Sequence, residues 1–303
     1  MATPRPVRGL RASTPLREAA RVFLAARLAD VEHHRKAVER RLTPGAVHDL
    51  RVALRRLRGA VRLFGKGAKA SRAAAELRRI QGGLGPLRDL HVQLARFTRL
   101  EETLPAPEAA VVAQVRAVLV AGRPRAVESA RTALQRWAKD GRPLLADLAR
   151  IRPPGKLGGH RLRNRLVRQL EELEGRVEAA LDDPSPEAMH RLRIAVKRSR
   201  YGLEFLEPAM PSETADIRAE LVPLQLMLGD LHDLDVQIAL VDRHAAHDAL
   251  PAAADLVRRL AAIREREGAA LTPALVHWEE EATALRAQVL LGSSPVRVGS
   301  PPG

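Results

Sequence analysis

Residues 47–58 read VHDLRVALRRLR, and residues 189–200 repeat the pattern as MHRLRIAVKRSR. From the histidine to the last arginine, six of eleven positions are identical and three more are conservative. A second pair follows in the same order: residues 81–93 read QGGLGPLRDLHVQ, and residues 225–237 read QLMLGDLHDLDVQ, with eight of thirteen positions identical. Two motifs that recur together at a nearly constant offset predict a duplicated architecture.

On an α-helix, each copy of the first motif has one apolar face and one basic face. At about 100° per residue, the basic side chains of the first copy fall within a sector of roughly 80°. The first basic row consists of His48, Arg51, Arg55, Arg58 and Arg62. The second basic row, at matching angles, consists of His190, Arg193, Lys197 and Arg200. Arg56 and Arg198 lie about 80° from the histidines and are second-tier candidates.

Two hypotheses account for these basic faces. An ordinary solvated helix surface usually intersperses acids at i+3 or i+4, because like charges at that spacing repel. The first basic row has no acid, and Glu204 appears only at the end of the second. A bound polyanion stabilises such uncompensated cations, and arginine donates two parallel hydrogen bonds to paired phosphate oxygens. We therefore favour a phosphate-binding site, with an exposed or structural role as the alternative for each arginine singly.

The repeated histidines and aspartates each allow two roles. His48 and His190 lie in the first turn of their predicted helices, where they either donate to phosphate, adding positive charge below about pH 6.5, or form hydrogen bonds inside the bundle. Asp89 and Asp233 recur in the second motif and either orient an arginine or cap the following helix. Neither a metal nor a cofactor is expected, since the chain has no cysteine and lacks His-x-x-x-His spacing.

Composition narrows the class of partner. The chain has 303 residues, a formal net charge of +15 and an isoelectric point of about 11.3, which together favour an acidic partner. Only 2% of its residues are aromatic, whereas single-stranded nucleic acids are usually held by stacking bases on aromatic rings. A polyanion without bases is therefore favoured over nucleic acid. The absence of cysteine and of any membrane-spanning stretch predicts a cytoplasmic protein.

The predicted fold is all-α, with two repeats of about four helices each, because no stretch alternates as a strand does. We expect a disordered leader (1–14), a first repeat (15–151), a linker (152–159), a second repeat (160–290) and a disordered tail (291–303). Glycine and proline predict helix breaks near residues 43–45, 65–67, 82–86, 122–124 and 141–143.

These motifs resemble those of the CHAD domain family (conserved histidine α-helical domain). The resemblance rests on residues 47–58, 81–93, 189–201 and 225–237, and it covers nearly the whole chain. It implies two tandem four-helix bundles, related by a pseudo-twofold axis, that enclose a basic groove or pore for inorganic polyphosphate. It also implies association with polyphosphate granules. The departures from the family pattern are Glu204, where symmetry with Arg62 would place a basic residue, and Ser199 at an apolar position.

The sequence thus predicts a non-enzymatic protein that binds polyphosphate through the two basic rows, with Arg56 and Arg198 as further contacts. Two alternatives remain open. In one, His48 or His190 accepts a phosphoryl group in a phosphotransfer reaction. In the other, the basic rows bind nucleic-acid phosphates non-specifically, with an affinity that falls steeply as salt rises.

Overall fold

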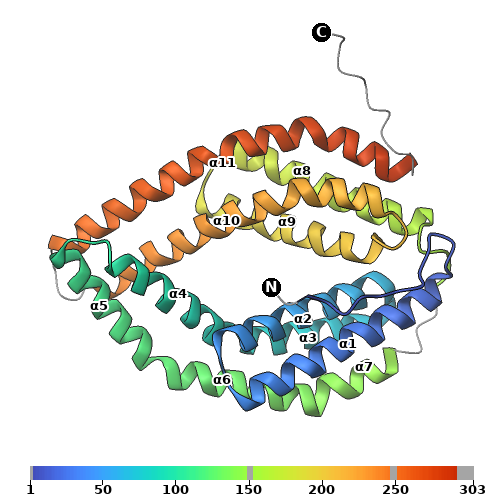
Figure 1. Ribbon diagram of the computed structural model, residues 1–303, viewed down its shortest axis with the longest axis horizontal. Helices are drawn as coiled ribbons and strands as arrows, with labels where there is room; N and C mark the ends of the chain where they lie inside the picture. Colours follow the sequence, from blue (N-terminus) through green and yellow to red (C-terminus); the bar gives the residue numbers. More distant parts are fainter. Residues whose placement is uncertain (1–2, 149–152, 246–250, 292–303) are drawn as a thin grey trace, which may run out of the picture. The chain divides into compact units, whose positions relative to one another are not determined.

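A computed structural model describes residues 3–148, 153–245 and 251–291 (Figure 1). Over these residues the chain is helical, and the β structure there is confined to one antiparallel bridge between Pro15 and Lys156. The predicted all-α class is therefore confirmed. Apart from Leu291, the predicted disordered tail lies outside the described residues.

The first four helices begin and end where capping residues and glycines place them. They are α1 (Leu16–Arg40), α2 (Pro44–Phe64), α3 (Gly67–Gly83) and α4 (Gly85–Glu101). Thr43 caps α2, since its hydroxyl accepts a hydrogen bond from the Ala46 N–H at 3.2 Å. The turn after α2 requires two glycines. A Cβ on Gly65 would lie 2.5 Å from the Cβ of Ala70, and Gly67 has a φ of +75°.

The rest of the first half is broken into short helices, whereas the second half contains long ones. α5 (Ala106–Ala121) and α6 (Arg123–Arg136) are followed by the π-helical turn η1 (Trp137–Gly141) and by α7 (Arg142–Leu148). After the predicted linker come α8 (His160–Asp182), α9 (Pro186–Leu206), α10 (Pro211–Ala245) and α11 (Pro251–Leu291). α10 runs unbroken through Gly229, although its counterpart in the repeated motif, Gly85, begins a new helix.

The chain divides into two compact units, and neither is a continuous stretch of sequence. Unit 1 comprises the residues up to Arg8, Leu16–Pro154 and Asp230–Glu267. Unit 2 comprises Gly9–Pro15, Gly155–Gly229 and the chain from Gly268 onward. α10 and α11 therefore each contribute to both units. These units group residues differently from the predicted repeats (15–151 and 160–290), and the internal structural repeat stays a prediction.

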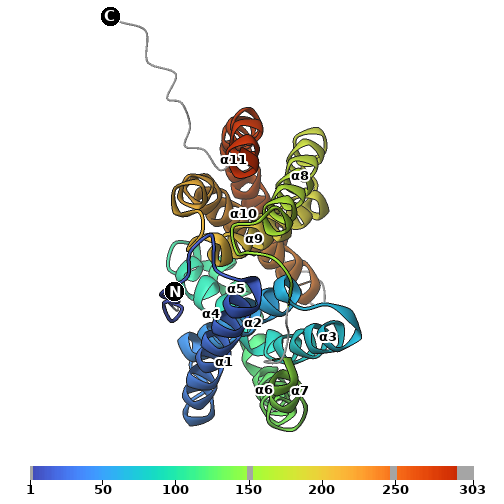
Figure 2. The same ribbon diagram turned by 90° about the vertical axis from the view of Figure 1, so that its right-hand side faces the viewer.

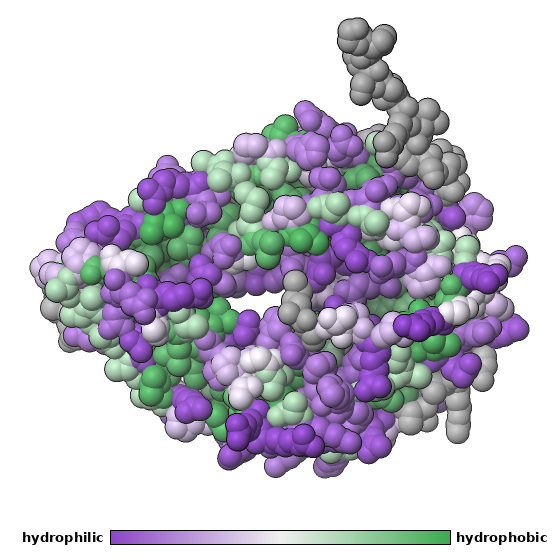
Figure 3. Space-filling model, viewed as in Figure 1, coloured by the Kyte–Doolittle hydropathy of each residue, from purple (hydrophilic) through white to green (hydrophobic). Residues whose placement is uncertain are grey.

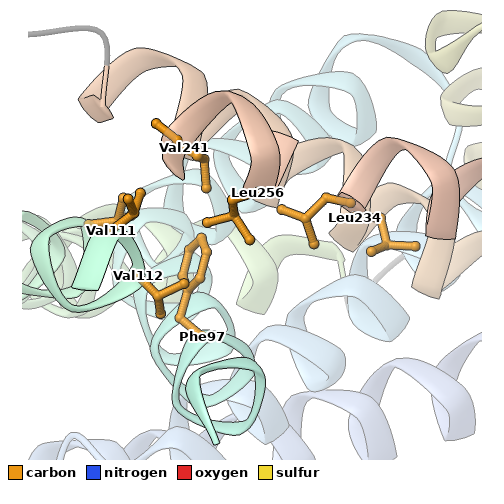
Figure 4. Packing of buried hydrophobic residues seen from close by; sticks show 9 residues of the cluster. Phe97, Val111, Val112, Leu234, Val241 and Leu256 are labelled. Carbon is orange, nitrogen blue, oxygen red and sulfur yellow. The ribbon is translucent and has the colours of Figure 1, made fainter. Parts of the chain in front are cut away.

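Unit 1 is held together by a hydrophobic core that draws on distant parts of the sequence. Within it, α2 packs against α1 and α3, and α6 packs against α3 and α4 (Figure 2). Figure 4 shows one buried cluster, in which Phe97 of α4 and Val111 and Val112 of α5 meet Leu234 of α10 and Leu256 of α11. Residues 230–267 therefore complete the core of unit 1.

Unit 2 is built around the pairing of α8 with α9. At the end of α11, Arg163 donates a hydrogen bond to the backbone carbonyl of Val289 at 3.0 Å, and Arg286 forms an ion pair with Glu174 at 2.9 Å. Residues 9–15 also belong to this unit, since the N–H of Gly158 donates to the carbonyl of Ala12 at 2.9 Å. This part of the predicted leader is thus held by backbone hydrogen bonds to the predicted linker.

Figure 3 shows one face, on which hydrophilic residues predominate and hydrophobic ones are scattered between them. Among the described helices, none has a stretch long and apolar enough to cross a bilayer.

Candidate phosphate-binding site

The first basic row lies along α2, whose other side is packed into unit 1. The buried apolar side chains of α2 include those predicted to face the core: Leu50, Leu54, Leu57, Val61 and Phe64. In the row, Arg62 is exposed and the other four members are half-buried. The amphipathic pattern therefore predicted correctly which face of α2 is buried. Most side chains of the first basic row are only partly accessible to water.

Arg51 is fixed by the end of the neighbouring helix. Its Nη1 donates a hydrogen bond to the carbonyl of Gln81 in the last turn of α3, at 2.7 Å. The guanidinium also packs closely against α4, because a Cβ placed on Gly85 would lie 3.4 Å from the same nitrogen. Burial lowers the pKa of Arg51; Asp89 opposes this effect, and Arg55 and Arg88 add to it. An arginine of the first motif thus lies beside the repeated glycine of the second.

Arg58 is half-buried and lies near three other arginines. Burial, followed by the charges of Arg62, Arg55 and Arg78, lowers the pKa of Arg58 to about 10. The guanidinium stays protonated near neutral pH, and its lowered pKa reflects first the burial of the charge and then its repulsion by the nearby arginines. Arg78 comes from α3 and was not among the residues predicted from sequence.

His48 is half-buried beside another cation that the sequence analysis missed. Burial and then Arg88 of α4 lower the pKa of His48 below 6.5. Burial also lowers the pKa of Arg88, against the opposing charges of Asp233, Asp89 and Asp49. The imidazole is therefore neutral at physiological pH, so it presents one N–H donor and no positive charge.

The second basic row lies on α9 in unit 2, and its members differ in exposure. His190 is exposed, whereas Arg193 and Lys197 are half-buried. Arg200 is buried: its Nε donates to the side-chain oxygen of Gln225 at 2.6 Å, and its guanidinium lies 4.6 Å from the ring centre of Tyr201. These contacts give Arg200 a structural role within unit 2, and its direct binding of phosphate stays a prediction.

The second-tier arginines are also occupied by the protein. Arg56 is buried at 6% exposure, on a part of α2 where its charge acts on His34 of α1. Arg198 is exposed and donates to both carboxylate oxygens of Glu172, at 3.0 and 2.7 Å. Neither geometry supports phosphate binding as directly as that of the first basic row.

The repeated aspartates lie inside helices, which is not the position of a helix cap. Asp89 belongs to α4 and Asp233 to α10. Asp233 accepts a hydrogen bond from Arg96 at 3.3 Å, and Arg96 also donates to Asp230 at 3.2 Å. One partner of Asp233 is thus an arginine outside the basic rows. Within the described parts of the chain, no cluster of acidic and histidine side chains could hold a metal ion.

Arg78 and Arg88 could not be predicted from the sequence, because the periodicity of one helix does not show which side chains of neighbouring helices lie beside it. Both lie on neighbouring helices, and only the packing of α3 and α4 near α2 brings their charges to the first basic row. One signal was available for Arg88, which lies within the second repeated motif next to Asp89. No repetition marks Arg78, since its counterpart at the same offset is Val222.

The histidines of unit 1 predict a pH-dependent stability. Burial lowers the pKa values of His34, His48 and His91, so the unfolded chain takes up protons first as pH falls below 6.5. Stability is then lost on acidification through this range. We expect a lower melting temperature at about pH 5.5 than at about pH 7.5, and a smaller difference in His48→Gln/His91→Gln. Equal pH dependence in the wild type and this variant would contradict the assignment.

Comparisons with known proteins agree with this architecture. The family model described as the CHAD domain matches residues 22–242. The crystal structure of the CHAD domain from the plant Ricinus communis has 23% sequence identity and a TM-score of 0.65, and the alignment covers 95% of this chain and 96% of that one. PptA from Streptomyces chartreusis has 20% identity and a TM-score of 0.65, with coverage of 89% and 100%. None of the curated proteins compared matches this chain.

Proposed function

The chain belongs to the CHAD domain family, and we propose that it binds inorganic polyphosphate along the first basic row without catalysing a reaction. The family is associated with polyphosphate. In this proposal Arg193 and Lys197 of the second row supply further contacts in unit 2, and binding directs the protein to polyphosphate granules. The enclosed groove or pore implied by the resemblance is part of the same proposal.

The observation that supports the proposal most strongly is the lowered pKa of the half-buried Arg58 guanidinium. Its pKa of about 10 reflects burial next to three other arginines, an arrangement that costs free energy in the unliganded protein. A chain of phosphates beside these side chains offsets that cost at every position it passes. A helical row at about 6 Å per four residues also suits a ligand whose charge repeats along its length.

The two histidines differ in a way that weakens the phosphotransfer hypothesis. His190 is exposed, whereas His48 is half-buried next to Arg88. A phosphoryl acceptor must be reached by a donor protein, and only one of the two equivalent residues meets this condition. A histidine that only contacts bound phosphate can be less exposed than a phosphoryl acceptor, because a phosphate chain is smaller than a donor protein and can reach a half-buried side chain.

A competition titration tests the proposal. Labelled long-chain polyphosphate is bound at roughly physiological salt, where the Debye length is about 8 Å, and is then challenged with unlabelled polyphosphate, duplex DNA or single-stranded RNA. We expect polyphosphate to compete much better per charge than either nucleic acid, because few aromatic residues are available to hold bases. Equal competition per charge would show a non-specific cationic surface and would exclude polyphosphate as the specific ligand.

A further inference from the structure

A pocket of about 310 Å³ opens where α2 turns into α3, at the end of the first basic row. Three cationic side chains line it, namely Arg62, Lys66 and Arg78, together with the hydroxyl-bearing Ser71. No carboxylate belongs to this lining among the residues that the structure describes. The volume is at the lower end of the range for small-molecule sites, which suits one or two phosphate groups rather than a long segment of chain.

The backbone around the pocket is fixed, and two of its three cationic side chains, Lys66 and Arg78, have no acidic partner among the described residues. Gly65 and Gly67 set the turn, the first through its close approach to Ala70 and the second through its positive φ. The side chains of Lys66 and Arg78 make no ion pair or hydrogen bond with the other residues that the structure describes. Burial, followed by the charges of Arg62, Arg55 and Arg78, lowers the pKa of Arg58, one turn before Arg62, to about 10. The pocket is therefore a preformed concentration of positive charge.

The second half of the chain does not reproduce these side chains. At the offsets of the two motifs, the counterparts of Arg62, Lys66 and Arg78 are Glu204, Pro208 and Val222. In unit 2, Glu204 lies 4.0 Å from Arg200, so the end of the second row has a carboxylate where the first has an open cationic pocket. Whatever the pocket binds is thus bound in one repeat only.

We propose that this pocket binds the terminal phosphate group of a polyphosphate chain, so that the protein recognises a chain end. The inference rests on the proposed function, because the pocket continues the first basic row. A terminal phosphate carries up to two negative charges near neutral pH, since its second pKa is about 6, whereas each internal phosphate carries one. The compact pocket, with its three cationic side chains, is complementary to the more highly charged terminal group. The elongated basic row is complementary to the singly charged internal groups that follow it.

Linear and cyclic phosphates separate chain-end recognition from general anion binding. Linear tripolyphosphate has two terminal groups, whereas cyclic trimetaphosphate has the same number of phosphates and no ends. We expect Lys66→Gln/Arg78→Gln to weaken binding of the linear anion by about tenfold or more, and that of the cyclic anion by less than about twofold, in calorimetric titrations. Loss of affinity for both anions by the same factor would overturn the proposal.

The matched control is Lys69→Gln/Arg72→Gln, which makes the same change of charge on the same helix. Both residues are exposed and lie outside the pocket lining. We expect this control to bind both anions as the wild type does, whereas a loss equal to that of the pocket variant would show a bulk charge effect and overturn the proposal. Circular dichroism and melting curves should be the same for both variants, since none of the four side chains is buried.

Two further titrations distinguish this inference from others. Orthophosphate that binds as tightly as linear tripolyphosphate would identify a site for free phosphate and overturn chain-end recognition. If long-chain polyphosphate fails to bind the wild type, the proposed function itself fails. If long chains bind but the linear and cyclic anions respond alike to the pocket variant, only the chain-end inference fails.

Discussion

Charge reversal at one matched position in each repeat is expected to abolish high-affinity polyphosphate binding. The variant is Arg55→Glu/Lys197→Glu, which changes the central member of the first basic row and its counterpart in the second. A charge-assisted hydrogen bond contributes about 1.5–3 kcal/mol, so losing two should reduce affinity by roughly 100-fold or more, before any repulsion is added. The slope of log affinity against log salt should also become shallower, because fewer counterions are displaced.

The control for this variant is Arg21→Glu/Arg176→Glu. Both arginines are exposed, one on α1 and one on α8, so the net charge changes by the same amount away from the basic rows. We expect affinity within a few fold of the wild type, and melting temperatures that agree among the three proteins. A control that loses as much affinity as the row variant would show that total charge, rather than the rows, determines binding.

Phe97→Ala is expected to destabilise unit 1 by about 3–5 kcal/mol, the usual cost of truncating a fully buried phenylalanine. Phe97 is 0% exposed and packs with Val112 of α5 and Leu256 of α11 (Figure 4). The free energy of unfolding is measured by urea titration, monitored by circular dichroism. The matched variant is Phe205→Ala in unit 2. Phe205 is 2% exposed, so this substitution removes the same type of side chain from the core of unit 2.

The two phenylalanine variants should be separable in the unfolding curve. If the units unfold independently, Phe97→Ala shifts one transition and Phe205→Ala the other, whereas a single shared transition shifts in both variants. If Phe97→Ala lowers the free energy of unfolding by less than about 1 kcal/mol, the assignment of residues 230–267 to the core of unit 1 is contradicted. Phe97 would then not be tightly packed against those residues.

The periodicity of the first motif was sufficient to predict both α2 and its buried face. Leucine spacing identified Leu50, Leu54 and Leu57 as core residues, and Thr43-Pro44 and Gly65 marked the ends of the helix. Such local patterns work because capping and amphipathicity act within one or two turns. The same reasoning could not show that Arg200 would be buried against Gln225, since that contact depends on how α10 packs beside α9 in unit 2.

The division of the chain into two interleaved units could not be predicted either, because it also depends on contacts between distant parts of the sequence. Pro153-Pro154-Gly155 has the composition of a linker, but composition does not show that residues 230–267 leave the second half to complete unit 1. Phe97 and Leu256 lie far apart in the sequence, and no local signal connects them. The basic rows could be predicted because each lies on one helix and follows from the spacing of nearby residues. The cations from neighbouring helices could not, because their positions depend on how the helices pack.

The interleaving of the two units sets an order of events during synthesis. Unit 1 cannot close its core until Glu267 has left the ribosome, although its first long segment ends at Pro154. At about 5–20 residues per second, synthesis from the end of α5 (Ala121) to Glu267 takes roughly 7–30 seconds, and α10 and α11 cannot cover the apolar faces of α4 and α5 before then. For that interval the nascent chain presents Phe97, Val111 and Val112 to solvent, which makes it a substrate for chaperones that bind exposed apolar segments. A ribosome that stalled between residues 154 and 230 would prolong this exposure and favour aggregation.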